Sequence, residues 1–104
     1  MQPGMTITNE PGYYKDGAYG IRIENVMLVK KEDTPNRFGD VDYYSFEHVT
    51  LVPIQTKLID VELLTKQEKE WINKYHAKCF EKVSPLLKAD EPGYMWLYRE
   101  TRPI

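Results

Sequence analysis

The sequence predicts a fold of the α+β class, in which an antiparallel sheet comes first and helices follow. Two observations support this prediction. The first half holds short, alternating runs rich in β-branched residues, separated by Gly and Pro. The second half opens with a helix-capping sequence and then repeats apolar residues at intervals of three and four. We therefore expect one long helix and one short helix after the strands.

Residues 5–8 (Met-Thr-Ile-Thr) alternate as a strand should. Residues 10–13 (Glu-Pro-Gly-Tyr) place Pro and Gly at the two centre positions of a type II turn. Asp16, Gly17 and Gly20 would extend this turn into a loop. The run from Ile21 to Val29 is the clearest strand, and because neither of its faces is purely polar, we expect it to be covered on both sides.

Arg22 and Glu24 project from the same face of that predicted strand. A carboxylate in the middle of a covered strand is costly unless it is paired or binds a metal ion. Composition alone favours a structural Arg22–Glu24 ion pair over a metal ligand. Both interpretations remain open at this point.

Residues 30–42 are polar and predict an exposed loop or a hairpin arm, and Tyr43–Val52 predicts a further strand. Thr65 and Glu68 form a capping box that starts a helix. Pro85 should bend or end this helix. A short second helix is expected to begin near Asp90, Glu91 and Pro92. The apolar face of the long helix would consist of Ile72, Tyr75, Cys79, Val83 and Leu86.

Composition limits the possible classes of partner. The chain has 104 residues, a net charge of -2 and one Cys, so it forms no disulfide within itself. Its longest basic run, Lys30-Lys31, is followed at once by two acidic residues, which argues against nucleic acid and anionic membranes as partners. No apolar stretch approaches the roughly 20 residues of a membrane span, and no signal peptide opens the chain. A cytoplasmic location is the expectation.

Several segments together resemble the carboxy-terminal part of the Xaa-Pro aminopeptidases, a branch of the "pita-bread" metallopeptidases. The Glu-Pro-Gly turn alone would be weak evidence, but it is joined by Arg-Ile-Glu-Asn and by Val-Pro-Ile-Gln-Thr-Lys in the same order. The later segments are most similar to the larger eukaryotic-type enzymes, whose carboxy-terminal extension helps to form a homodimer. The resembling segments are residues 4–14, 20–25, 51–60, 71–76, 96–97 and 100–104.

The resemblance implies a site with two divalent metal ions, usually manganese, held by two Asp, one His and two Glu. It implies that Glu10 binds one ion and that Glu24 bridges both. Tyr14 and Arg22 would orient these carboxylates. The substrate would be a peptide that begins Xaa-Pro, from which the first residue is removed. Oxygen ligands suit hard divalent ions, which agrees with these roles.

The chain lacks the upstream Asp pair and the ligand His of the resembling family, since only nine residues precede Glu10. His48 and His76 do not stand where that His belongs, and His76 is interpreted as a packing residue. With two of five ligands, we expect weak metal binding and no peptidase activity from the chain alone. Residues 1–64 would be the end of the catalytic domain, and residues 65–104 a helical, dimer-forming extension.

Three readings of such a chain stay open. It is the carboxy-terminal piece of an aminopeptidase, or a non-catalytic interaction module that keeps the dimer-forming helices, or a half-enzyme completed by a separate polypeptide. Truncation of the parent sheet also predicts self-association, because a sheet that has lost neighbouring strands exposes edges and apolar surface.

Overall fold

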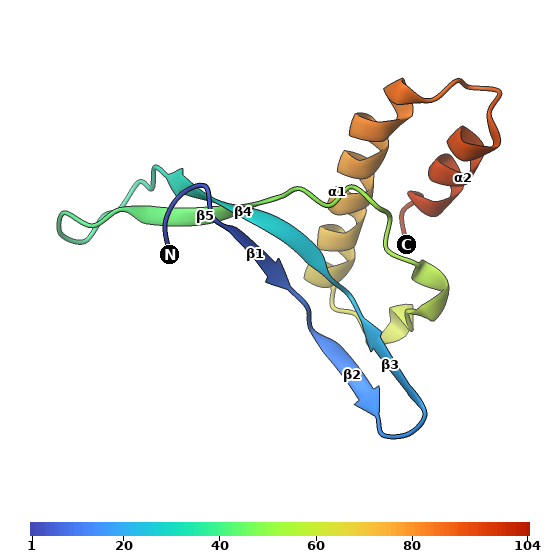
Figure 1. The fold of residues 1–104 in the computed structure, drawn as a ribbon, viewed down its shortest axis with the longest axis horizontal. Coiled ribbons are helices and arrows are strands. Elements are labelled where there is room, and N and C mark those ends of the chain that lie inside the picture. Colours follow the sequence, from blue (N-terminus) through green and yellow to red (C-terminus); the bar gives the residue numbers. More distant parts are fainter. The chain divides into compact units, whose positions relative to one another are not determined.

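A computed structural model describes all 104 residues and confirms the α+β class, with antiparallel strands followed by two α-helices (Figure 1). The chain divides into two compact units, Met1–Thr50 and Leu51–Ile104. The first unit contains all the strands and the second all the helices. The division predicted after residue 64 concerns a larger catalytic domain and remains a prediction.

The first unit holds two small sheets. A three-stranded sheet has the order β1-β4-β5, and a two-stranded sheet pairs β2 with β3, all antiparallel. The strands are β1 (Thr6–Asn9), β2 (Gly12–Lys15), β3 (Tyr19–Arg22), β4 (Asn25–Glu32) and β5 (Tyr43–His48).

The two sheets share one hairpin register. Asn9 lies opposite Asn25 in β1–β4, and Gly12 lies opposite Arg22 in β2–β3. Two residues lie between the pairs on each strand, so the alignment is the same on both sides of the break. The Ile23 N–H donates to the Pro11 carbonyl oxygen at 3.2 Å across the interruption. β1 and β2 therefore run against β3 and β4 as one long ribbon with a gap at its centre (Figure 1).

This ribbon corrects two predictions from the sequence. The type II turn at residues 10–13 does not form, because Gly12 lacks the positive φ that such a turn requires and begins a strand instead. The chain reverses at Gly17, whose φ is 68°. The single strand predicted over Ile21–Val29 is two strands, interrupted at Ile23 and Glu24. Pairing with the opposite strand on both sides of Pro11 keeps the backbone extended where local propensity favours a turn.

The buried face of the first unit belongs to β4. Asn25, Met27 and Val29 alternate with more exposed residues and are all buried. β5 is shorter than predicted and ends at His48. The exposed arm predicted over residues 30–42 covers only residues 33–42, because β4 continues to Glu32.

The second unit begins with two short 3-10 turns at Thr56–Leu58 and Val61–Leu63, followed by α1 (Lys66–Val83). The predicted capping box is present: the Glu68 N–H donates to Thr65 Oγ1 at 3.3 Å, and the Thr65 N–H donates to Glu68 Oε2 at 2.8 Å. α1 ends two residues before Pro85, which lies in a 3-10 turn at Ser84–Leu86. α2 (Pro92–Glu100) starts where predicted.

Polar side chains on α1 hold other segments of the second unit. Buried His76 accepts a hydrogen bond at Nε2 from the Ile54 N–H at 3.1 Å, and the Tyr75 hydroxyl donates to the Val52 carbonyl oxygen at 2.7 Å. Burial lowers the pKa of His76 and raises the pKa of the Tyr75 phenol, so both groups are neutral. The interpretation of His76 as a packing residue is confirmed.

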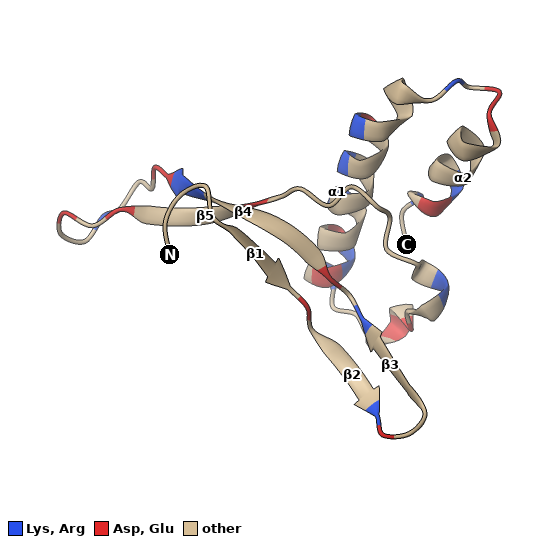
Figure 2. Cartoon of the chain, in the orientation of Figure 1, with Lys and Arg blue, Asp and Glu red and all other residues tan.

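Residues of both charge signs occur in the strand-containing unit and in the helical unit (Figure 2). The absence of a nucleic-acid partner stays a prediction. None of the helices has the length and apolar content needed to cross a membrane.

Candidate metal-binding site

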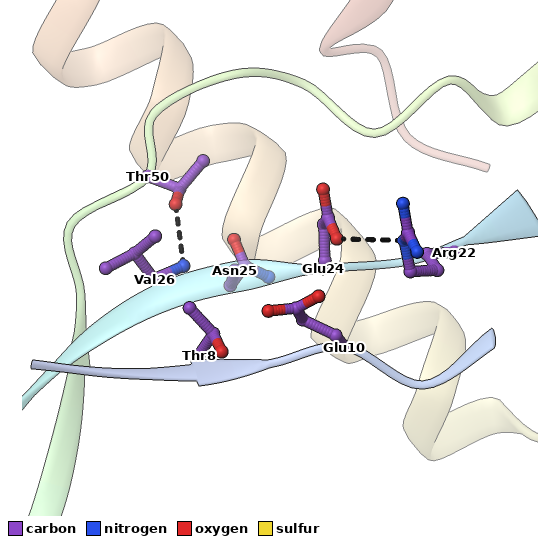
Figure 3. A pocket seen from close by; sticks show the side chains of 7 residues that line it. All are labelled: Thr8, Glu10, Arg22, Glu24, Asn25, Val26 and Thr50. Atoms are coloured by element: carbon purple, nitrogen blue, oxygen red, sulfur yellow. Dashed lines mark hydrogen bonds and ion pairs between the residues drawn. The ribbon is translucent and has the colours of Figure 1, made fainter.

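Glu10 and Glu24 lie at the central gap of the ribbon and line the same pocket, which has a volume of about 370 Å³. Their carboxylates enter it from neighbouring backbone segments (Figure 3). The complete lining is Thr8, Glu10, Arg22, Glu24, Asn25, Val26 and Thr50.

The shared register explains why these two carboxylates meet. Glu10 follows Asn9 and Glu24 precedes Asn25, so continuing the β1–β4 alignment by one step sets Glu10 opposite Glu24 on the same face. Like charges directly opposite one another in a ladder destabilise it, typically by about 0.2–1 kcal/mol. Two opposed carboxylates are therefore not expected to stabilise the fold, which agrees with the predicted ligand role.

Arg22 pairs with Glu24 as the sequence suggested, at 3.3 Å from Nε to Oε2. Both side chains are about half exposed, at 48% and 53%, so the prediction of a buried Glu24 is wrong. The strand interruption leaves this carboxylate uncovered. An exposed pair of this kind contributes little stability. It engages one Glu24 oxygen and leaves Oε1 without a hydrogen bond.

Tyr14 holds Arg22 from the opposite strand. Arg22 Nη1 donates to the Tyr14 hydroxyl at 3.3 Å, and the guanidinium carbon lies 5.9 Å from the centre of the ring. The hydrogen bond with Tyr14, assisted by the charge of Glu24, raises the pKa of Arg22. Tyr14, Arg22, Glu24 and Glu10 thus occupy one face of the ribbon.

Asn25 is a pocket residue that the site prediction missed. It is only 5% exposed, and its Oδ1 forms no hydrogen bond. A buried amide oxygen without a partner is uncommon and costs free energy. The available signal in the sequence was a polar side chain on the otherwise apolar face of Met27 and Val29.

The chemistry of these donors fits part of a divalent metal site. Carboxylate oxygens are the ligands that hard cations such as Mn²⁺ and Mg²⁺ prefer. No group of three or more His, Cys, Asp or Glu side chains is placed to hold a metal ion. His76 is engaged with Ile54 in the other unit. Glu10 and Glu24 alone would therefore make an incomplete coordination shell, which would need further ligands.

Comparison with family models gives two matches that follow one another along the chain. The C-terminal region of peptidase M24 matches residues 42–104, and metallopeptidase family M24 matches residues 1–31. The second match contains every residue named above as a candidate ligand or orienting group.

Individual relatives agree with these matches. The chain is 60% identical over all 104 residues to a probable Xaa-Pro aminopeptidase P of Coprinopsis cinerea, and 53% identical to aminopeptidase P2 of Arabidopsis thaliana. It spans 17% and 14% of the lengths of these two relatives.

A solved structure is also similar. The X-prolyl aminopeptidase of Caenorhabditis elegans, described as a cytosolic enzyme with a di-nuclear active site, superposes with a TM-score of 0.82 at 33% identity. The match covers the whole of this chain and 17% of that one.

Proposed function

The chain belongs to the M24 metallopeptidase family, and we propose that it is the segment of an Xaa-Pro aminopeptidase that supplies two carboxylates to a dinuclear metal site. The observation that carries the proposal is the placement of Glu10 opposite Glu24 in one pocket. Relatives that match the chain over its whole length are named Xaa-Pro aminopeptidase P and aminopeptidase P2, which supports the proposal. The proposed substrate is a peptide that begins Xaa-Pro.

Glu10 is proposed to bind one ion and Glu24 to bridge two. A carboxylate has two oxygens and can span ions about 3.5–4 Å apart. Two divalent ions, proposed as manganese, would polarise the scissile carbonyl and lower the pKa of a water molecule. The free Oε1 of Glu24 and the uncovered pocket leave room for this role.

Arg22 and Tyr14 are proposed to orient the bridging carboxylate. Arg22 fixes one Glu24 oxygen, and the Tyr14 hydroxyl fixes Arg22 in turn. Residues that hold a metal ligand in place typically change metal affinity or activity by about 10- to 100-fold when they are replaced. Both side chains are exposed, so their contribution to folding is small.

The decisive experiment compares the full-length enzyme with the 104-residue chain. Titration calorimetry with Mn²⁺ and an assay on an Xaa-Pro peptide should show tight binding and turnover only for the full-length enzyme. Its Glu10→Gln and Glu24→Gln variants should lose both. Micromolar Mn²⁺ binding with turnover by the 104-residue chain would refute the proposal that it is inactive alone.

A second role is proposed for the helical unit, as a self-association module. Met95, Trp96 and Tyr98 on α2 are 58%, 44% and 54% exposed, although Leu97 between them is buried. Exposed aromatic clusters of this kind are typical of interfaces. The proposed partner is a second copy of the chain, in the cytoplasm. Light scattering should give a dimer that Trp96→Lys dissociates, and a monomer at high concentration would count against it.

A further inference from the structure

We propose that Gly12 and Gly20 are positioning residues for the metal-binding carboxylate: they leave open the space in which Tyr14 lies against Arg22, and so hold Arg22 against Glu24. The inference rests on the proposed function. It concerns the geometry of the hairpin, in which Gly12 faces Arg22 and Gly20 faces Tyr14 across the two strands.

Gly20 lies beneath the ring of Tyr14. A Cβ atom at position 20 would stand 2.8 Å from Tyr14 Cδ1 and 3.2 Å from Cε1. Both distances are shorter than ordinary carbon–carbon contacts, which lie near 3.5–4.0 Å. Any side chain at position 20 would displace the ring.

Gly12 lies beneath the point where Tyr14 and Arg22 meet. A Cβ atom at position 12 would stand 2.7 Å from Arg22 Cγ and 2.9 Å from the Tyr14 hydroxyl oxygen. It would also stand 2.9 Å from the backbone oxygen of Ile21. The backbones of the two glycines therefore pack directly against the side chains that form the Tyr14–Arg22 hydrogen bond.

Backbone conformation does not require glycine at either position. The positive-φ glycines are Gly4, Gly17 and Gly39, and at each of them a Cβ atom would meet nothing within 4 Å. Gly12 and Gly20 show the reverse, since they have ordinary strand backbones and no space for a Cβ atom. Glycine is therefore needed at positions 12 and 20 for the space that it leaves, and not for its backbone freedom.

Packing of a core does not account for this arrangement either. All residues of β2 and β3 are exposed, and Tyr14 itself is 57% exposed. Gly in a strand interior also weakens the strand. The contacts lead instead from Gly20 through Tyr14 and Arg22 to Glu24, the proposed bridging ligand.

The test uses the full-length enzyme with its metal removed and measures Mn²⁺ affinity by titration calorimetry. Gly20→Ala and Tyr14→Phe should each weaken binding by about 10-fold, the lower limit for residues that orient a ligand. The double variant should bind no more weakly than either single one, because both changes break the same hydrogen bond. Gly12→Ala should cost more, because its Cβ atom also meets backbone.

Gly93→Ala in α2 is the matched control, because a Cβ atom there meets only Leu87 Cδ2 at 3.9 Å, and its affinity should equal that of the wild type. Glu24→Gln serves as the reference. If Glu24→Gln retains full affinity, the proposed function itself fails. If Glu24→Gln loses binding while Gly20→Ala behaves like the control, or adds its full effect to Tyr14→Phe, only the positioning role is overturned.

Discussion

The two units of the chain use polar side chains in opposite ways. In Met1–Thr50, Glu10 and Glu24 face each other in an open pocket, and the Asn25 amide oxygen has no partner. In Leu51–Ile104, polar groups mostly bind backbone: His76 Nε2 binds Ile54, although its Nδ1 has no partner, and the Asn73 side chain binds both backbone groups of Ile104.

The polar groups named in the first unit reduce the stability of the fold, and the hydrogen bonds to backbone in the second unit increase it. Opposed carboxylates and an unpaired amide make the fold less stable unless a ligand binds there. A buried side chain that satisfies a backbone N–H removes a penalty of about 1–3 kcal/mol. Substitutions in the first unit should therefore alter metal binding, and those in the second unit should alter stability.

The largest effect is expected for Glu24→Gln. In the full-length enzyme, Mn²⁺ affinity should fall on the order of 100-fold or more, because loss of a ligand exceeds the loss of a residue that orients one. Hydrogen exchange of β1 and β4 amides should show unchanged or slightly greater protection, by up to about 1 kcal/mol, since the opposed charge is removed. The control is Glu47→Gln, at an exposed position of β5; an equal loss of affinity there would contradict the prediction.

His76→Leu should lower stability without affecting the metal. The Ile54 N–H loses its acceptor, which should reduce the free energy of local opening by about 1–3 kcal/mol. Hydrogen exchange of the α1 amides measures this, with exposed Gln67→Leu on the same helix as the control. A drop in Mn²⁺ affinity comparable to that of Glu24→Gln would break the distinction between the two units.

Thr65→Ala should cost about 1 kcal/mol in α1, because the N-cap hydroxyl that accepts the Glu68 N–H and donates to Glu68 Oε2 is lost. The first α1 amides should exchange faster. Thr65→Ser keeps the hydroxyl and should restore most of the protection; if it does not, the cap is not the cause.

The smallest effect is expected from pH. Because burial lowers the pKa of His76 below 6.5, the unfolded state takes up the proton first, so α1 should lose stability as pH falls below about 6.5. The Glu32 pKa in the first unit is lowered by the hydrogen bond from Ser45, so its contribution is lost only below about 4.5. Amide hydrogen exchange, corrected for its intrinsic pH dependence, should show both losses of stability, one below about pH 6.5 and one below about pH 4.5. His76→Leu should abolish the upper one, and persistence of that window would refute the assignment.

Predictions from local signals were the most accurate. The capping box at Thr65 gave the start of α1, and Pro85 and Pro92 gave the end of one helix and the start of the next. The turn at Pro11 was wrong for the opposite reason. Pro-Gly favours a turn locally, but pairing with residues 22–25 on the other strand holds it extended.

Some residues of the candidate site were identified from the sequence, and others only from the structure. Glu10, Glu24, Tyr14 and Arg22 were identified from residue types and resemblance, and their roles as ligands and orienting groups remain predictions. Asn25 and the two glycines under Tyr14 were not identified, because their significance depends on burial and on contacts across the strands. The exposure of Glu24 was misjudged for lack of the same information.

Amino-acid order alone determined the class of fold, the helix boundaries and the oxygen-donor chemistry, because each depends on residues a few positions apart. The position of the chain reversal, which sets one carboxylate opposite the other and leaves both exposed to solvent, emerged only from the folded structure. Pro11-Gly12 and Asp16-Gly17 both favour a turn locally, and pairing along both arms of the hairpin decides between them.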